Sequence, residues 1–288
     1  MDTKSMRSLL ERHGFNFSKS LGQNFLVDKN IPEKIVRLSG ITEADGVLEV
    51  GPGIGALTSS LCRAAGHVTA IELDKRLLPI LEDTLSEFSN VDVVHGDVLK
   101  LDFAKIIGEK MPGLNPCVCA NLPYNITTPA LTAFINAGIF KSITVMIQLE
   151  VALRICAKPG TSDYGAFTVF ANYHTQPEIL FNVPPECFMP RPRVQSAVIT
   201  LRPRKNEHAV SAEDEAMFFR VVRATFIQRR KTLVNALYAG FGNYLQKDEL
   251  TEIVNNLGFN PQIRGETLDI RGFAMLSSAI SDRINALN

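Results

Sequence analysis

The sequence of 288 residues has no long apolar run, no excess of charge of either sign and no regular cysteine pattern. No apolar stretch approaches the roughly 20 residues that a membrane-spanning helix needs. The opening residues, MDTKSMRSLLERHGF, carry charges where a signal peptide would be apolar and acidic groups that argue against a transit peptide. The five cysteines stand at irregular spacings, which favours a reducing compartment over a disulfide framework. We therefore predict a cytoplasmic protein with no membrane partner.

The charges balance at 30 basic and 30 acidic residues, which by itself argues against a nucleic-acid-binding protein. Their distribution is uneven, because basic residues outnumber acidic ones by ten to four between residues 191 and 231. A polyanion could bind this segment and not the rest of the chain. The alternative is an ordinary solvated basic face, and charge alone leaves both interpretations open.

Apolar segments alternate with helical ones over the first 150 residues, and 45% apolar residues are enough for a sizeable core. Strands are predicted at 47–50, 68–72, 91–94, 117–120 and 143–149. Helices are predicted at 28–39, 55–65, 75–88 and 129–137. Asp28 can cap the first of these helices, and Pro32 suits its first turn. The alternation predicts crossover connections and a mostly parallel sheet covered on both faces.

Two more strands are predicted at 177–183 and 195–202, close enough in sequence to pair as an antiparallel edge, for seven strands in all. After the turn-rich segment 202–208 the apolar pattern becomes helical. Helices are predicted at 212–227, 230–240, 247–257 and 273–286. The sequence therefore predicts an α/β domain of residues 1–204 and a small all-helical domain of residues 205–288.

A glycine-rich loop follows the first strand of the predicted sheet, with Gly51, Gly53 and Gly55 directly before a helix. Glycines at alternate positions let the main chain pass close to a ligand at the helix N-terminus. Glu72 ends the next strand, where a carboxylate can accept both hydroxyl hydrogens of a ribose. Loop and acid together fit a nicotinamide nucleotide or S-adenosylmethionine. The alternative, an ordinary tight strand-to-helix turn, is less favoured because loop and acid fall at strand ends in the right order.

Two further polar residues end predicted strands. Asp97 follows the third strand, where its carboxylate could hydrogen-bond an adenine amino group, and Asn121 follows the fourth. Ligands of open α/β sheets bind outside the carboxyl ends of the strands. We therefore expect Gly51, Glu72, Asp97 and Asn121 to line one crevice.

The tetrapeptide Asn121-Leu122-Pro123-Tyr124 predicts chemistry on an amine. The exocyclic amine of adenine is a poor nucleophile because its lone pair is delocalised into the ring. The Asn121 side-chain oxygen and a nearby main-chain carbonyl can accept its two hydrogens and aim the lone pair at an electrophile, without a strong base. Pro123 stiffens the loop, and Tyr124 offers a ring to a base taken out of its stack.

These motifs resemble the small-subunit (16S) ribosomal RNA adenine dimethyltransferases of the KsgA/RsmA family. The resemblance spans roughly residues 15 to 275. Its blocks are SKSLGQNFLVD (18–28), EVGPGIGALT (49–58), IELD (71–74), GDVL (96–99), NLPYNITTP (121–129), FMPRPRVQSAV (188–198) and FIQRRKTLVNAL (226–237). The family is built on a Rossmann-like class I methyltransferase domain with a helical C-terminal domain. The resemblance therefore implies this fold, RNA or ribosome binding by the second domain, and a role in small-subunit biogenesis.

The resemblance also implies S-adenosylmethionine as the cofactor and gives roles to individual positions. The cofactor would be bound by Gln23, Asn24, Leu26, Gly51, Gly53, Glu72, Asp97 and Asn121. Asn121 and the main-chain oxygen of Leu122 would hold the target amine, and Tyr124 would stack on the target base with Phe188 opposing it. From the pattern alone, Phe188 is only an aromatic residue in a proline-rich loop. The implied reaction is methyl transfer to adenine N6, twice on each of two adjacent adenosines near the 3' end of 16S rRNA.

The resemblance favours RNA binding over a solvated face for the basic segment, since phosphate contacts position RNA without reading its sequence. The predicted RNA-binding residues are Arg191, Arg193, Arg223, Arg229, Arg230 and Lys231. Zero net charge is unusual for an RNA-modifying enzyme, and recognition of a folded ribosomal particle by shape would account for it. Cys117 and Cys119 have no second cysteine pair nearby, so no metal is predicted. The protein is predicted to be a monomer.

Two alternative functions stay open. One is the related class that modifies an adenosine of large-subunit RNA and confers macrolide resistance; isoleucine usually follows the asparagine there, so Leu122 favours the small subunit. The other is a non-catalytic ribosome-assembly or RNA-binding factor, against which the intact Asn121 and Tyr124 argue. A DNA adenine methyltransferase would more often carry Asp-Pro-Pro-Tyr or Asn-Pro-Pro-Tyr, and a nicotinamide oxidoreductase would need a hydride-transfer constellation. The sequence shows neither pattern.

Overall fold

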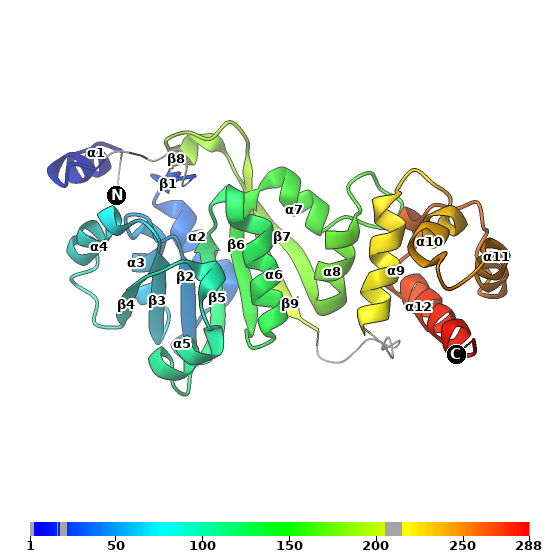
Figure 1. Cartoon of the computed structure of the whole chain (residues 1–288). Coiled ribbons are helices and arrows are strands. Elements are labelled where there is room, and N and C mark those ends of the chain that lie inside the picture. The colour runs from blue at the N-terminus through cyan, green and yellow to red at the C-terminus, as the bar shows by residue number, and fades with distance from the viewer. Residues whose placement is uncertain (1–2, 16, 18–21, 205–214, 288) are drawn as a thin grey trace. The chain divides into compact units, whose positions relative to one another are not determined.

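The computed structural model describes residues 3–15, 17, 22–204 and 215–287 (Figure 1). The chain divides into two compact units. The first consists of residues 1–152 and 176–203, and the second of residues 153–175 and 204–288. Within the described ranges, no helix has the length and apolarity that crossing a membrane requires.

A seven-stranded sheet runs through the first unit in the order β4-β3-β2-β5-β6-β9-β7. The strands are β2 (Asp45–Val50), β3 (His67–Glu72), β4 (Val91–His95), β5 (Asn115–Asn121), β6 (Ser142–Gln148), β7 (Thr175–Val183) and β9 (Ser196–Pro203). The pairs β2–β3, β3–β4, β2–β5 and β5–β6 are parallel, whereas β6 and β9 are antiparallel. The predicted Rossmann-like, mostly parallel sheet of seven strands is therefore confirmed. A separate two-stranded ladder joins β1 (Phe25–Leu26) to β8 (Phe188–Met189).

The strand order reverses at β2, which has β3 on one side and β5 on the other. Such a switch point opens a crevice at the carboxyl ends of the strands in open α/β sheets. All six residues of β2 are buried, as expected for a central strand whose two faces are both covered. The loop that follows β2 therefore extends from a fully buried strand of the sheet.

Helices follow the strands in the first unit. They are α1 (Thr3–Arg12), α2 (Asn30–Ser39), α3 (Ala56–Cys62), α4 (Leu78–Thr84), α5 (Phe103–Lys110) and α6 (Thr127–Ala137), and α7 (Leu149–Ile155) begins in this unit. Near the start of α2, the Asp28 carboxylate accepts a hydrogen bond from the Asn30 N–H at 2.9 Å, and Pro32 lies in the first turn. The predicted helix at 75–88 divides into a 3-10 turn, Lys75–Leu77, and α4, which has a proline in its first turn. The sequence pattern did not predict α1 and α5.

Two of the hydrophobic clusters of the first unit show how its helices pack. In one, Val47 and Val68 of the sheet pack with Leu61 of α3. In the other, α1 packs with α4 through apolar residues at helical spacing: Met6, Leu9, Leu10, Ile80 and Leu81. The i, i+3, i+4 spacing in α1 explains why this short segment forms a helix, since one face is buried along its length.

The second unit is built from helices joined by turns and loops, and of the strands only the first residue of β7, Thr175, falls among its described residues. Its helices are α8 (Ala166–His174), α9 (Glu215–Ile227), α10 (Leu233–Phe241), α11 (Lys247–Asn256) and α12 (Ile270–Asn285). Its core contains Phe218 of α9, Leu237 of α10 and Phe273 of α12. Residues 153–175, which precede the predicted boundary near 204, belong to this unit because α8 adds to the same core: the rings of Tyr173 and Phe218 lie 4.6 Å apart. The division of functions between residues 1–204 and 205–288 stays a prediction.

Candidate cofactor and substrate pocket

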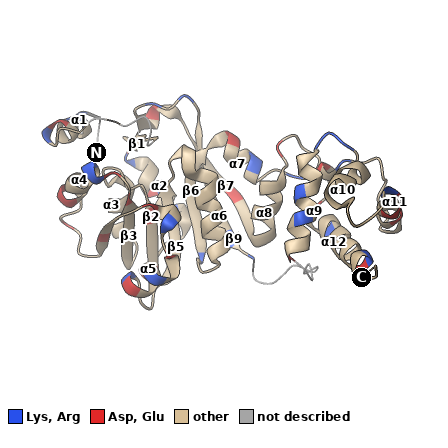
Figure 2. Cartoon of the chain, in the orientation of Figure 1, with Lys and Arg blue, Asp and Glu red and all other residues tan. Residues whose placement is uncertain are grey.

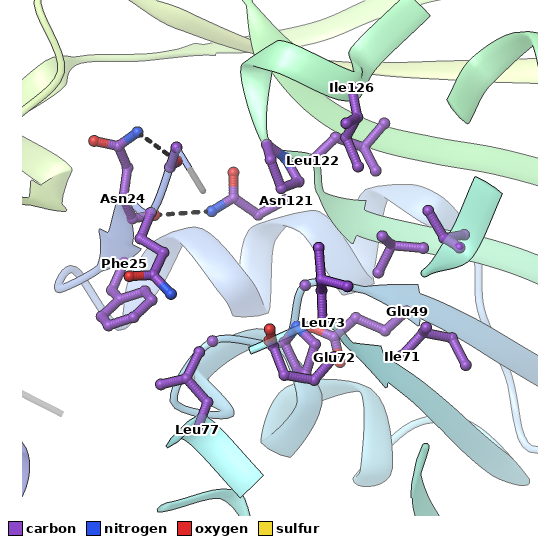
Figure 3. Close-up of a pocket in the computed structure, with 18 of the residues that line it drawn as sticks. Asn24, Phe25, Glu49, Ile71, Glu72, Leu73, Leu77, Asn121, Leu122 and Ile126 are labelled. Atoms are coloured by element: carbon purple, nitrogen blue, oxygen red, sulfur yellow. Dashed lines mark hydrogen bonds between the residues drawn. The ribbon is translucent and has the colours of Figure 1, made fainter. Parts of the chain in front are cut away.

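A pocket lies at the carboxyl ends of β2, β3, β4 and β5 (Figure 3). Its walls come from the glycine loop after β2, the tips of the next three strands and the segment 22–26. All eight residues predicted to bind the cofactor line it: Gln23, Asn24, Leu26, Gly51, Gly53, Glu72, Asp97 and Asn121. Leu122 and Tyr124 line it as well. One pocket therefore gathers groups that are up to a hundred residues apart in the sequence.

The glycine loop needs its glycines for conformation and for space. Gly51 and Gly53 have φ values of +65° and +62°, which residues with a side chain rarely adopt. A Cβ on Gly53 would lie 2.9 Å from Cδ1 of Phe25, so the bare main chain makes room for that ring. The Gly51 N–H donates to the Ile71 carbonyl at 2.9 Å, which ties the loop to β3. The loop thus forms a pocket wall of main chain without side chains, packed closely against Phe25 and joined to β3.

Glu72 is held at the tip of β3 with only 5% of its surface exposed. Its Oε1 accepts a hydrogen bond from the Asp74 N–H at 2.8 Å. Burial raises the pKa of Glu72 to about 7, partly offset by main-chain hydrogen bonds to the carboxylate. The carboxyl group is therefore fixed in position and titrates near neutral pH.

A second buried carboxyl group, that of Glu49, lines the same pocket from β2. It is 1% exposed, and its Oε2 has no hydrogen-bond partner among the described residues. Burial raises its pKa to about 8; the neighbouring Thr58 hydroxyl opposes this rise, and the negative charge of Glu72 adds to it. Glu49 was not among the residues predicted from the sequence, although its place two residues before Gly51 was a visible signal. An unpartnered buried oxygen at a pocket wall marks a place where a ligand can bond.

Asp97 and Asn121 complete the row of strand tips. Asp97 accepts a hydrogen bond from the Leu99 N–H at 3.1 Å, and the preceding Gly96 N–H donates to the Glu72 carbonyl at 2.9 Å. The tips of β3 and β4 are thereby joined. The expectation that Gly51, Glu72, Asp97 and Asn121 line one crevice agrees with the geometry of the pocket.

The side-chain amide of Asn121 has a defined orientation. Its Nδ2 donates to the main-chain oxygen of Asn24 at 3.2 Å (Figure 3). The carbonyl oxygen Oδ1 is consequently the atom left to accept a hydrogen bond from a ligand. The next residue, Leu122, is 1% exposed and is held on β6 because its N–H donates to the Met146 carbonyl at 3.1 Å.

Tyr124 is anchored by its hydroxyl group, which lies 2.7 Å from Oγ of Ser196. Burial raises the pKa of the Tyr124 phenol, so the hydroxyl stays protonated at neutral pH. Phe188 does not line the pocket: it is 4% exposed, pairs with Leu26 in the β1–β8 ladder and packs in the core of the first unit. Its role opposite Tyr124 stays a prediction.

The basic residues predicted to bind RNA differ in how they are held. Arg193, Arg223, Arg230 and Lys231 are exposed, whereas Arg191 forms an ion pair with Glu186. Arg229 is engaged within the second unit: its Nε donates to Glu266 at 2.6 Å and its Nη2 to the Ser162 carbonyl at 2.6 Å. Figure 2 shows basic residues on α9 and on the segment that joins α9 to α10. The RNA-binding role of all six stays a prediction.

No group of three or more His, Cys, Asp or Glu side chains able to hold a metal occurs in the part of the chain that the structure describes. Cys117 and Cys119 are both buried in β5.

Comparisons with known proteins place the pocket in a family context. Residues 14–272 match the family described as ribosomal RNA adenine dimethylase. The chain is 48% identical over 278 residues to the ribosomal RNA small subunit methyltransferase A of Geobacillus kaustophilus, covering 96% of this chain and 94% of that protein. A dimethyladenosine transferase from Plasmodium falciparum has a similar structure, with a TM-score of 0.75, 25% identity and coverage of 90% of this chain and 98% of that one. The 23S rRNA methyltransferase ErmE shares the fold, with a TM-score of 0.67, 24% identity and coverage of 89% and 99%.

Proposed function

This chain belongs to the ribosomal RNA adenine dimethylase family, and from that premise we propose that it methylates adenines of 16S rRNA in the small ribosomal subunit, using S-adenosylmethionine. The family match covers most of the chain, and the curated relatives at 47–49% identity carry the name ribosomal RNA small subunit methyltransferase A. This identity supports the small-subunit substrate over the large-subunit one. The likeness to ErmE, at 24% identity, concerns the fold alone.

The residues of the pocket fit S-adenosylmethionine. Glu72 places a fixed carboxylate where ribose hydroxyls can donate to it, and Gly51 lines the pocket with main chain that carries no side chain. Glu49 adds a buried oxygen that lacks a partner among the described residues and suits a polar group of the ligand. When bound, the cofactor supplies an electrophilic methyl group on a sulfonium. Asp97, at the tip of β4, is the candidate for the adenine amino group.

The observation that carries the proposal is the orientation of Asn121. With its Nδ2 bonded to the Asn24 carbonyl, the amide presents Oδ1 as the acceptor for a hydrogen of the target amine. Accepting that hydrogen draws the lone pair of the amine out of the ring and toward the methyl group, which is catalysis by positioning and electrostatics. The main-chain oxygen of Leu122 is the second acceptor in this proposal, and Tyr124, fixed through Ser196, is the stacking surface for the base.

The proposal extends to the product, which is N6,N6-dimethyladenosine at two adjacent adenosines near the 3' end of 16S rRNA. It also includes a role in small-subunit biogenesis. The RNA would be positioned by exposed cations such as Arg223, Arg230 and Lys231. The bacterial relatives support cytoplasmic location of the enzyme, which we take to be a monomer.

The test uses labelled S-adenosylmethionine with undermethylated small subunits, large-subunit RNA and duplex DNA in parallel, followed by digestion to nucleosides. The proposal expects N6,N6-dimethyladenosine from the small subunits alone. Label on the large-subunit RNA would move the protein to the macrolide-resistance class with the same pocket chemistry. No label on any substrate, with cofactor binding confirmed by calorimetry, would point to the non-catalytic assembly factor.

A further inference from the structure

Asp74 is a buried carboxylate in the loop after β3, with 7% of its surface exposed. Its Oδ1 accepts from the Arg76 N–H at 3.1 Å and from Nε of Arg76 at 2.9 Å. Its Oδ2 accepts from Nη2 of Arg76 at 2.7 Å and from Nε2 of Gln23 at 2.8 Å. The hydrogen bonds from Arg76 hold the pKa of Asp74 below its usual value. Asp74 is therefore an anion with four donors arranged around it.

Asp74 connects two walls of the pocket. Gln23 belongs to the segment 22–26, and its bond to Asp74 spans 51 residues of sequence. On the other side, the Asp74 N–H donates to Oε1 of Glu72 at 2.8 Å. Gln23 and Glu72 both line the pocket, whereas Asp74 does not. One residue outside the pocket thus fixes two groups inside it.

Arg76, which binds the carboxylate of Asp74, also contacts an aromatic residue of the N-terminal region. The Arg76 guanidinium lies 5.1 Å from the ring centroid of Phe15, which is buried in the cluster formed by α1 and α4. Phe15 and Phe25 are also in ring contact, with centroids 6.0 Å apart. The half-exposed guanidinium of Arg76 therefore contacts an aromatic ring as well as the Asp74 carboxylate.

We infer that Asp74 is a positioning residue for S-adenosylmethionine: it holds Gln23 and Glu72 in the arrangement that binds the cofactor, without touching the cofactor itself. This inference rests on the proposed function, because it takes the pocket to be the cofactor site. It distinguishes Asp74 from an ordinary helix cap. A cap of the turn at Lys75–Leu77 would affect stability alone, whereas a positioning residue affects cofactor affinity through Gln23.

The test is a reciprocal exchange of the two side chains. Asp74→Asn places an amide donor against the Gln23 amide or against Arg76, and Gln23→Glu places two carboxylates together, so each should weaken cofactor binding about tenfold. The double variant Gln23→Glu/Asp74→Asn restores one donor and one acceptor with reversed polarity. We expect it to recover most of the affinity, to within about threefold of the unmodified enzyme.

Calorimetric titration of the full-length protein with S-adenosylmethionine measures the dissociation constant. Steady-state kinetics on small subunits should show a raised KM for the cofactor with kcat nearly unchanged in each single variant. The matched control is Asp83→Ala, which removes an exposed acid that pairs with Arg12 and His13 between α1 and α4. It loosens the same N-terminal region outside the pocket and should leave cofactor affinity unchanged.

The outcomes separate the inference from the proposed function. If the unmodified protein does not bind S-adenosylmethionine, the proposed function fails and the inference fails with it. If it binds and methylates, but Asp74→Asn binds the cofactor equally well, only the inference is overturned. Additive losses in the double variant would also overturn it, because they would show that Gln23 and Asp74 act independently. If Asp74→Asn does not fold, the cofactor affinities of Gln23→Glu and Gln23→Ala are compared instead. The inference requires Gln23→Glu to bind the cofactor more weakly, because its carboxylate is repelled by Asp74, and equal affinities would overturn the inference.

Discussion

The pocket of the first unit and the basic surface of the second hold their charged groups in different ways. Glu72 in the pocket wall and Asp74 directly behind it are buried, and each accepts hydrogen bonds that fix its position. On the basic surface, Arg223, Arg230 and Lys231 are exposed. A fixed, buried group has a shifted pKa and one geometry, so its loss should affect one step strongly. An exposed cation acts through summed charge, so its loss should produce a graded effect that depends on salt.

The largest expected effect comes from Asn121→Ala. It removes the acceptor that the Asn24 carbonyl orients, so methyl transfer should fall by about three orders of magnitude. Cofactor affinity, measured by calorimetry, should change by less than about threefold, since Gly51, Glu72 and Asp97 remain. Asn115→Ala is the control at the opposite end of β5, where the side chain bonds only to the Ala44 carbonyl among the described contacts. A variant at Asn121 that methylates at the normal rate would remove the proposed role of the tetrapeptide.

Glu72→Ala should weaken cofactor binding by roughly a hundredfold, because two hydroxyl groups lose a charged acceptor. The rate of methyl transfer at saturating cofactor should fall much less, which is the reverse of the pattern expected for Asn121. Glu82→Ala, an exposed acid on α4, serves as the control. Calorimetry decides the outcome, and an unchanged affinity would rule out the ribose assignment.

Cofactor affinity should also depend on pH through Glu72. Its pKa of about 7 means that the free enzyme must lose a proton to bind ribose hydroxyls, so the affinity should rise about tenfold between pH 6 and pH 8. The stability of the free protein should move in the opposite direction. The folded state holds this proton more tightly than the unfolded chain, so the contribution is complete below pH 4.5 and is lost as the pH rises through 7. Titrations of Glu72→Gln at both pH values supply the control, because that variant should lack the tenfold change.

The features that the sequence predicted correctly are those encoded locally. The strands around β2 were recognisable because buried parallel strands read as continuous apolar runs. The polar residues Glu72 and Asn121 were recognisable because each ends such a run, and Asp97 because it follows one after Gly96. Helix α1 was not predicted, because its apolar stripe has only three residues. These residues are buried only through their packing against α4, which the sequence pattern does not reveal.

Contacts between distant segments account for what the sequence could not predict. Phe188 reads as a loop aromatic, yet its pairing with Leu26 in a two-residue ladder buries it outside the pocket lining. The bond between Gln23 and Asp74 has no local signature, because an acid after a strand suits a helix cap equally well. Arg229 belongs to a run of basic residues in the sequence. Only the fold shows that its guanidinium forms an ion pair with Glu266.

The smallest effects are expected for substitutions on the basic surface. There, Arg229 and its neighbour Arg230 can be compared directly. Arg230→Ala removes an exposed cation, so binding to small subunits should weaken severalfold and the slope of affinity against salt should fall by about one. Arg229→Ala removes a guanidinium held by Glu266 and by the Ser162 carbonyl, so it should lower the melting temperature by about 2–4 °C. The two variants should therefore separate, one in salt-dependent binding and the other in thermal unfolding. An equal loss of salt-dependent binding in both would mean that Arg229 exchanges Glu266 for phosphate, and the basic surface would then be larger than its exposed cations indicate.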